Sequence, residues 1–315
     1  MTNTTSYGDE VAVVTVTYFP GETLGRFLDT LEKATDRDVQ VVVADNASTD
    51  GAPEQAAERD NVKLVSIGEN VGYGTAANRG VAALDDRFGW VVVVNPDLEW
   101  EPGSLDELLE VAKRWPRGAA FGPLIHDLDG TVYPSARLLP SFGRGVGHAV
   151  FARVWPSNPW TRDYRQESAS PVERTAGWLS GSCQLIRREA FDSVDGFDTR
   201  YFMYFEDVDL GDRLAKAGWL NVYAPSSSVM HIGGAATSQA SKEDAARAPR
   251  QRVPLYRGSA PRPAVEAGPA GRAPRAQAAG ETGDPEGLKC CKYPEIDIGG
   301  SEDARADHPV KYPDE

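Results

Sequence analysis

The sequence predicts an α/β protein with a mostly parallel central sheet, and two observations indicate this fold class. Runs of apolar, β-branched residues without polar alternation, such as VAVVTVT over residues 11–17, are typical of strands buried on both faces. Segments with apolar residues at helical spacing separate these runs, and such alternation usually produces a parallel sheet covered by helices. The 315 residues are enough for one large domain or two small ones.

Strands and helices are expected in alternation over residues 11–94. The strands are recognised by their β-branched, apolar composition, and the helices by apolar residues three or four positions apart. The predicted strands are residues 11–17, 39–44, 62–67 and 90–94, and the predicted helices are an amphipathic one carrying Leu24, Phe27, Leu28 and Leu31 and an Ala-rich one at 73–84.

The pattern changes after the fourth strand. Ser104 is expected to be the N-cap of a helix that runs to about Arg114, with Glu107 at the capping-box position. Short strands joined by turns follow, and Asp129-Gly130 is a hairpin-turn signal. A long irregular loop is expected over residues 141–172.

The composition excludes several classes of protein. The net charge of −14, from 33 Lys and Arg against 47 Asp and Glu, argues against general nucleic-acid binding, because most of the surface would repel a polyanion. Three cysteines cannot form a disulfide framework, which favours a reducing compartment. The N-terminus lacks the pattern of a signal peptide, and no apolar run approaches the roughly 20 residues that span a bilayer. We therefore expect a soluble, cytoplasmic protein.

Residues 238–315 differ from the rest of the chain. They hold 10 of the 22 prolines and 2 of the 3 cysteines, but no Trp or Phe. Such a segment buries too little apolar surface to offset its chain entropy, so we expect a disordered tail. Residues 1–10 are expected to be a flexible N-terminus.

Polar residues follow three of the predicted strands, as Thr17-Tyr18, Asp45-Asn46 and Asn95-Pro96-Asp97. Ligands of open α/β sheets bind beyond the carboxyl ends of the strands. One Asp-Asn pair would be an ordinary loop feature, but three such strand ends together indicate a binding site. No loop reads GxGxxG or GxxxxGK(S/T), so dinucleotide and P-loop sites lose their main support.

The second half of the chain adds another polar group. Glu206, Asp207 and Asp209 begin an amphipathic helix, where acidic residues also simply favour the helix dipole. The oxygens of Asp97 and the imidazole of His231 can together hold a divalent ion, and a mixed site that also binds diphosphate suits Mg²⁺ or Mn²⁺. A histidine alone is more often an ordinary packed residue.

Several blocks of the sequence, taken in order, resemble a known family. They are VTVTYFPGETLGRFLDTL, VVVADNASTDG, ENVGYGTAANRG, VVVVNPDLEW, GWLSGSCQLIRREAFDSVDGFDTRYFMYFEDVDLGDRLAKAGW and HIGG. Together they look like the family 2 inverting glycosyltransferases with the GT-A fold, over residues 11–237, and most like the actinobacterial rhamnosyltransferases. The resemblance implies a nucleotide-binding half at 11–122 and an acceptor half at 123–237. It also implies transfer of L-rhamnose from dTDP-rhamnose to a polyprenyl-diphospho-GlcNAc acceptor.

The resemblance assigns the donor side of the site residue by residue. Asp45 would accept a hydrogen bond from the edge of the base, and Thr17 and Tyr18 would line the same pocket. Asn78 and Arg79 would approach the ribose-diphosphate.

The remaining assignments concern the metal and the sugars. Asp97 ends a DXD-like element that here reads Asn95-Pro96-Asp97, so only one of its two carboxylates is present. His231 matches the second metal-side residue of the family. Gly181-Ser182 would border the acceptor and the donor sugar.

An inverting single displacement needs one base to take the proton of the attacking hydroxyl. Asp207, in the ED element, would be that base, and Glu206 would orient it or position the acceptor. A bound cation would offset the charge that develops on the departing diphosphate.

Three alternatives stay open. The chain could be a catalytically silent sugar-nucleotide-binding module, although the series Asp45, Asp97, Asp207 and His231 argues against this. It could be a nucleotidyltransferase, but the loop at 18–21 after the first strand lacks the basic residue expected there. A family 2 transferase that uses a UDP-sugar is the third.

The tail departs from the family, whose members continue past HIGG into a basic helical region that contacts the membrane. Here Ala, Pro, Arg and Gly dominate from Asp244, as GC-rich codons produce in a shifted frame. One hypothesis is therefore a frameshift between about Ser241 and Asp244, and the alternative is a genuine disordered tail. The shifted reading is strongly basic and would suit an anionic membrane surface, which implies a peripheral position at the inner face of the plasma membrane.

Overall fold

The structure, a computed structural model, describes residues 7–139 and 171–232. The predicted tail at 238–315 and nearly all of the loop predicted at 141–172 lie outside these residues. The described strands are β1 Glu10–Thr17, β2 Gln40–Asp45, β3 Val62–Ser66, β4 Phe88–Val94, β5 Leu98–Trp100, β6 Gly118–Asp127, β7 Val132–Tyr133, β8 Ala136–Arg137, β9 Arg174–Ala176, β10 Trp178–Leu179, β11 Cys183–Arg187 and β12 Leu220–His231. The described helices are α1 Glu22–Ala34, α2 Ala52–Ala56, α3 Tyr73–Ala82, α4 Ser104–Arg114, α7 Arg188–Ser193 and α8 Glu206–Lys216.

One mixed sheet runs through the described part of the chain, in the order β3-β2-β1-β4-β11-β6-β12-β5. The four strands β3, β2, β1 and β4 are all parallel, which confirms the fold class predicted from their apolar runs. Beyond β4 the sheet becomes mixed, because β11 is antiparallel to both β4 and β6 whereas β6 and β12 are parallel. The β1–β2 and β1–β4 pairings bring the carboxyl ends of three strands to the same edge.

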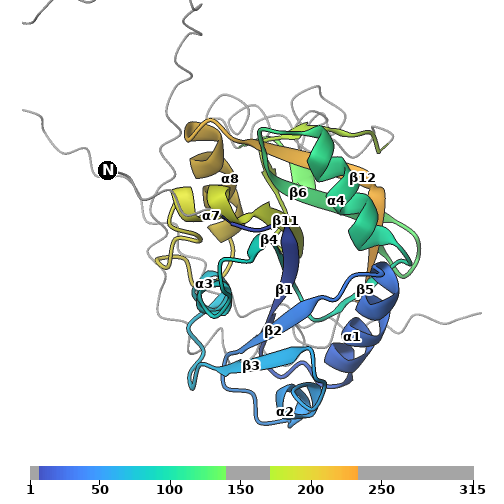
Figure 1. The fold of residues 1–315 in the computed structure, drawn as a ribbon, viewed down its shortest axis with the longest axis vertical. Coiled ribbons are helices and arrows are strands. Elements are labelled where there is room, and N and C mark those ends of the chain that lie inside the picture. The colour runs from blue at the N-terminus through green and yellow to red at the C-terminus, as the bar shows by residue number, and fades with distance from the viewer. Residues whose placement is uncertain (1–6, 140–170, 233–315) are drawn as a thin grey trace, which may run out of the picture. The chain divides into compact units, whose positions relative to one another are not determined.

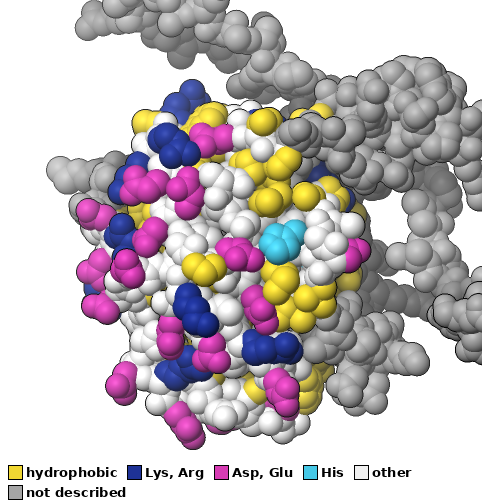
Figure 2. Space-filling view, turned by 90° about the vertical axis from the view of Figure 1, so that its right-hand side faces the viewer, with side chains coloured by type: hydrophobic (Ala, Val, Ile, Leu, Met, Phe, Trp, Pro, Cys, Tyr) yellow, Lys and Arg dark blue, Asp and Glu magenta, His cyan; other side chains and the backbone are white. Residues whose placement is uncertain are grey.

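Helices cover both faces of this sheet (Figure 1). The apolar faces of α1 and α4 pack on one side, in a cluster that includes Phe27 and Leu108. The helices α3, α7 and α8 pack on the other side, in a cluster that includes Phe191 and Leu210. On the surface that carries α1 and α4, acidic and basic side chains are interspersed (Figure 2). No helix among the described residues is long and apolar enough to cross a membrane.

The helix predicted to begin with Ser104 as its N-cap does form, but the cap was wrong. Gly103 is the N-cap, with a left-handed φ of 72°, and Ser104 is the first helical residue. The hydroxyl of Ser104 donates to the carbonyl oxygen of Glu101 at 2.6 Å and caps no helical N–H group. Glycine adopts this left-handed conformation at the N-cap of α4 without steric cost, so the chain enters the helix there without a side-chain cap.

The predicted hairpin turn at Asp129-Gly130 is confirmed. It joins β6 to β7, which pair antiparallel with Ile125 opposite Tyr133. Gly130 has a φ of 80°, a conformation that glycine adopts without steric cost.

The close packing of α3 on β1 depends on Gly80. A Cβ atom at this position would lie 2.5 Å from Cγ1 of Val14 and 3.2 Å from Cβ of Ala44. Both neighbours are buried in the sheet and cannot move aside.

We expect the substitution Gly80→Ala to lower the free energy of unfolding by about 1–3 kcal/mol, because it overpacks this contact. The matched control is Gly25→Ala in α1, where an added Cβ meets no atom within 4 Å. That change should stabilise the protein by roughly 0.5–1 kcal/mol through helix propensity. Urea unfolding of both variants tests the pair, and equal shifts would contradict this account of the packing.

Candidate active site

The carboxylate of Asp45 lies at the carboxyl end of β2 and joins two loops. Its Oδ1 accepts hydrogen bonds from Oγ1 of Thr17 at 2.7 Å and from Oγ of Ser48 at 2.5 Å, and its Oδ2 accepts one from the Ser48 N–H group at 2.9 Å. The Ser48 hydroxyl oxygen in turn accepts the N–H group of Phe19 at 2.9 Å. Thr17 and Asp45, both predicted site residues, are therefore in direct contact, and Tyr18 lies beside them in sequence. Ser48 is a contact that sequence reasoning missed.

Asp97 and His231, the predicted metal pair, also meet. Oδ2 of Asp97 lies 3.2 Å from Nε2 of His231, and the Ile232 N–H group donates to the Asp97 carbonyl oxygen at 3.0 Å. Oδ1 of Asp127 lies 3.7 Å from Nδ1 of the same histidine. The hydrogen bond with Asp97, with the negative charges of Asp97 and Asp127, raises the pKa of His231 above its ordinary value although burial opposes this.

The donor set around Asp97 fits a hard divalent cation. Asp97 is buried, and its Oδ1 has no hydrogen-bond partner, so a buried carboxylate oxygen is left for a ligand. A carboxylate with an imidazole leaves most positions of a Mg²⁺ or Mn²⁺ ion for substrate phosphates and water, as is usual for such ions. Within residues 7–139 and 171–232, no group of three or more His, Cys, Asp or Glu side chains is arranged to hold a metal ion.

Glu206 and Asp207 open the helix α8. Oδ2 of Asp207 accepts the N–H group of Gly181 at 3.0 Å, and its Oδ1 accepts that of Val208 at 2.8 Å. Burial raises the pKa of Asp207, and these backbone hydrogen bonds oppose the rise. Burial and the neighbouring Asp207 charge raise the pKa of Glu206 to about 7. Oε2 of Glu206 is buried without a hydrogen-bond partner.

Tyr73, which sequence reasoning placed only in an Ala-rich helix, belongs to the site. Its hydroxyl donates to the Gly181 carbonyl oxygen at 2.6 Å. Burial raises its pKa well above the ordinary value, and the charges of Glu206, Asp207 and Asp97 add to the rise. The Tyr73 phenol thus lies within electrostatic range of both the ED pair and Asp97. The ED pair and Asp97 therefore belong to the same region of the structure. The only feature of the sequence that could have indicated this role is the position of Tyr73 in the first turn of the predicted helix.

Gly181 connects these groups through its backbone. Its carbonyl oxygen accepts from Tyr73 and its N–H group donates to Asp207. The neighbouring Ser182 carbonyl oxygen accepts the N–H group of Asn95 at 2.9 Å, at the end of β4. The predicted Gly181-Ser182 element therefore lies between the ED pair and the Asn95-Pro96-Asp97 element.

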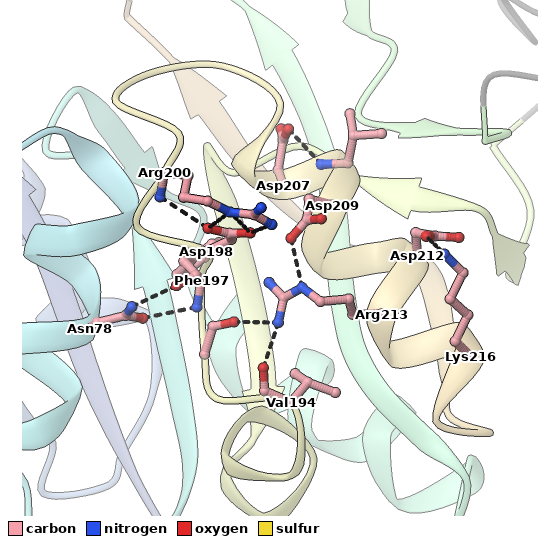
Figure 3. Close-up of polar contacts among 12 residues, drawn as sticks. Asn78, Val194, Phe197, Asp198, Arg200, Asp207, Asp209, Asp212, Arg213 and Lys216 are labelled. Carbon is pink, nitrogen blue, oxygen red and sulfur yellow. Dashed lines mark hydrogen bonds and ion pairs between the residues drawn. The ribbon is translucent and has the colours of Figure 1, made fainter. Parts of the chain in front are cut away.

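The segment that leads into α8 is held from two sides (Figure 3). Nδ2 of Asn78 donates to the Phe197 carbonyl oxygen at 2.8 Å, and its Oδ1 accepts the Phe197 N–H group at 2.9 Å. Arg213 of α8 pairs with Asp209 at 2.6 Å and donates to the carbonyl oxygens of Val194 at 2.5 Å and Gly196 at 2.8 Å. This segment places Glu206 and Asp207 opposite α3.

Asn78 therefore has a structural task, because both ends of its amide bind the Phe197 backbone. Arg79, its neighbour on α3, is exposed. The roles of Asn78 and Arg79 toward a ribose-diphosphate stay predictions.

A large groove lies elsewhere, with a volume of about 840 Å³. It is lined by residues at the amino ends of the parallel strands, among them Glu10, Gln40, Val62 and Phe88. The strands separate it from the residues described above, so it is not part of this site.

Comparison with known proteins agrees with the fold. Residues 12–195 match the family described as Glycosyl transferase family 2. The chain is 58% identical over 233 residues to the N-acetylglucosaminyl-diphospho-decaprenol L-rhamnosyltransferase of Mycobacterium tuberculosis, which covers 71% of this chain and 76% of that one. It is 24% identical to the rhamnosyltransferase WbbL of Escherichia coli, over 70% of this chain and 83% of the relative.

A solved structure of GalNAc-T7 with UDP, GalNAc and Mn²⁺ superimposes with a TM-score of 0.53 at 17% identity, over 71% of this chain and 44% of that one. This likeness supports the GT-A fold. The chain belongs to glycosyl transferase family 2 and is a glycosyltransferase.

The raised pKa of Glu206 makes stability depend on pH with a definite sign. Between the ordinary value of 4.5 and about 7, the folded protein holds a proton that the unfolded chain releases. The free energy of unfolding should therefore fall as the pH rises through this range, by about 3 kcal/mol relative to a Glu206→Gln variant. Urea unfolding of both proteins at several pH values measures the difference, and a constant difference would show that Glu206 titrates normally.

Proposed function

We propose that this protein is an inverting, metal-dependent rhamnosyltransferase that uses dTDP-rhamnose and a polyprenyl-diphospho-GlcNAc acceptor in cell-wall synthesis. The 58% identity to the Mycobacterium tuberculosis L-rhamnosyltransferase carries the proposal, since that relative is named for this acceptor type. The arrangement of Asp207, Gly181 and Tyr73 supports it, because Gly181 binds both Asp207 and Tyr73, and the Tyr73 phenol lies within range of the charges of Asp207 and the metal-side Asp97. Because the acceptor is lipid-linked, the protein would work at the inner face of the plasma membrane.

Asp207 is the base in this proposal. Backbone N–H groups of Gly181 and Val208 fix its carboxylate, so it meets the acceptor hydroxyl in a defined orientation. It takes the hydroxyl proton while the hydroxyl oxygen forms a bond to the anomeric carbon. The bond between that carbon and the diphosphate oxygen breaks on the opposite face, which inverts the configuration. The adjacent Glu206 positions the acceptor.

The donor lies along the carboxyl edge of the sheet in this proposal. Asp45, with Thr17 and Tyr18, receives the base, and Asn78 and Arg79 lie toward the ribose-diphosphate. Asp97 and His231 would hold Mg²⁺ or Mn²⁺, which offsets the charge on the departing diphosphate. Gly181 and Ser182 border the two sugars.

A donor screen tests the function. With a polyprenyl-diphospho-GlcNAc acceptor and Mg²⁺ or Mn²⁺, we expect turnover with dTDP-rhamnose to exceed that with any UDP-sugar, and a chelator to abolish it. The configuration at the anomeric carbon of the product, read by NMR, should be inverted. Preference for a UDP-sugar would overturn the donor assignment, and hydrolysis without transfer would overturn the acceptor.

The variant Asp207→Asn tests the base. It keeps the shape of the side chain and the hydrogen-bond acceptor toward Gly181, but it cannot take a proton. We expect the transfer rate to fall by at least about 10²-fold while the Kd for dTDP stays within about twofold. The control is Asp212→Asn on the same helix, whose carboxylate pairs with Lys216 and not with the site. Retained transfer in Asp207→Asn would assign the base to another residue.

A further inference from the structure

Three consecutive large apolar side chains lie exposed directly before the ED pair. Met203 is 39% exposed, Tyr204 is 67% and Phe205 is 50%. Elsewhere in the described ranges, the exposed large apolar residues are single ones. Exposure of adjacent apolar side chains to water is unfavourable, and contiguous exposed apolar surface of this kind marks an interaction site. We refer to residues 203–205 as the apolar triplet.

The backbone of the apolar triplet is also strained. Tyr204 and Phe205 both have a φ of 67°, in the left-handed region that bulky residues rarely enter. Such outliers persist only where the surroundings impose them, and they gather at functional sites. The backbone on both sides of Tyr204 is held, because the Tyr73 N–H group donates to the Phe202 carbonyl oxygen at 2.9 Å and the Asp209 N–H group donates to that of Phe205 at 2.9 Å. The hydrogen bonds of Asn78 and Arg213 hold the start of the same segment. The fold therefore holds exposed apolar rings in a costly conformation beside Glu206.

The position of the apolar triplet and its side chains indicate its partner. The triplet directly precedes Glu206 and Asp207, so the lipid of an acceptor whose hydroxyl reacts at Asp207 leaves the site close to it. A neutral hydrocarbon chain gains free energy when it covers exposed apolar side chains. A flexible Met and two rigid aromatic rings suit such a chain.

We propose that the apolar triplet docks the isoprenoid chain of the lipid-linked acceptor. This proposal rests on the proposed function, in which the acceptor hydroxyl reaches Asp207 and its lipid leaves the site past the adjacent surface. The triplet would thereby select a lipid-linked acceptor over a soluble sugar.

The test uses the double variant Tyr204→Asn/Phe205→Asn in the full chain. Asparagine enters the left-handed region more readily than aromatic residues, so the variant removes apolar surface without adding strain. Its thermal midpoint should not fall below that of the wild type. The control is Val172→Asn, which removes an exposed apolar side chain in a different part of the chain (56% exposed).

Two acceptors separate the contributions: polyprenyl-diphospho-GlcNAc with a long chain, and the same diphospho-sugar with one or two isoprene units. For the long-chain acceptor we expect the double variant to raise KM about tenfold with kcat unchanged, and for the short one to change KM less than about twofold. The control should change neither. An equal rise in KM for both acceptors would show that the rings of Tyr204 and Phe205 contact the sugar and not the lipid chain. No rise in KM for either acceptor would show that the triplet does not bind the acceptor. Both results overturn the proposal.

Two binding measurements complete the test. Co-sedimentation with vesicles of neutral phosphatidylcholine, without acceptor, should be the same for wild type and double variant, and a loss confined to the variant would assign the triplet to the bilayer instead. Binding of the two acceptors in the absence of donor separates this proposal from the proposed function. A wild type that binds the long chain through the triplet but transfers no sugar would refute the function and retain the docking surface.

Discussion

The burial of β1 between β2 and β4 is the constraint on which the rest of the structure depends. Val13 and Val14 are fully buried, one against each helical layer, so the strand cannot shift by one residue without exchanging its two faces. Its parallel register places Thr17 opposite Asp45, and Thr15 opposite Val94. The polar residues that follow three apolar strands therefore emerge at one edge.

The backbone of Gly181 then joins the two halves of the site. It is bound by Tyr73 from the first half and binds Asp207 from the second. Around it lie buried carboxylates in a medium of low dielectric constant, where unpaired charges interact strongly. Burial and the Asp207 charge therefore raise the pKa of Glu206, and the buried Asp97 oxygen without a partner is costly in the same surroundings. A proton on Glu206 relieves part of this electrostatic cost.

The segment between α7 and α8 has a strained backbone, with positive φ angles at Tyr204 and Phe205 directly before the ED pair. The side-chain amide of Asn78 binds both the N–H group and the carbonyl oxygen of Phe197, as the backbone of a neighbouring strand would do. Arg213 donates to two further carbonyl oxygens, those of Val194 and Gly196. Hydrogen bonds to four backbone groups thus hold the start of one loop, which further on contains two aromatic residues with positive φ. Rigidity of this kind serves orientation at a reacting centre, where small displacements are costly.

The sequence by itself determined the parallel half of the sheet, the helices α1 and α3, and the pairing of Thr17 with Asp45 and of Asp97 with His231. Apolar runs and helical spacing report burial directly, and parallel strands bring their ends together, which accounts for Thr17 and Asp45. Asp97 and His231 were expected together from their ligand chemistry, and the antiparallel pairing of β12 with β5 is what brings them into contact. Only the tertiary structure decided that Gly103 rather than Ser104 caps α4, that Tyr73 belongs to the site, and that Asn78 holds Phe197. A tyrosine in an Ala-rich helix has no distinctive pattern, and its role arises from Gly181, which lies more than a hundred residues away. Such contacts depend on how distant segments pack, and local sequence carries no record of that.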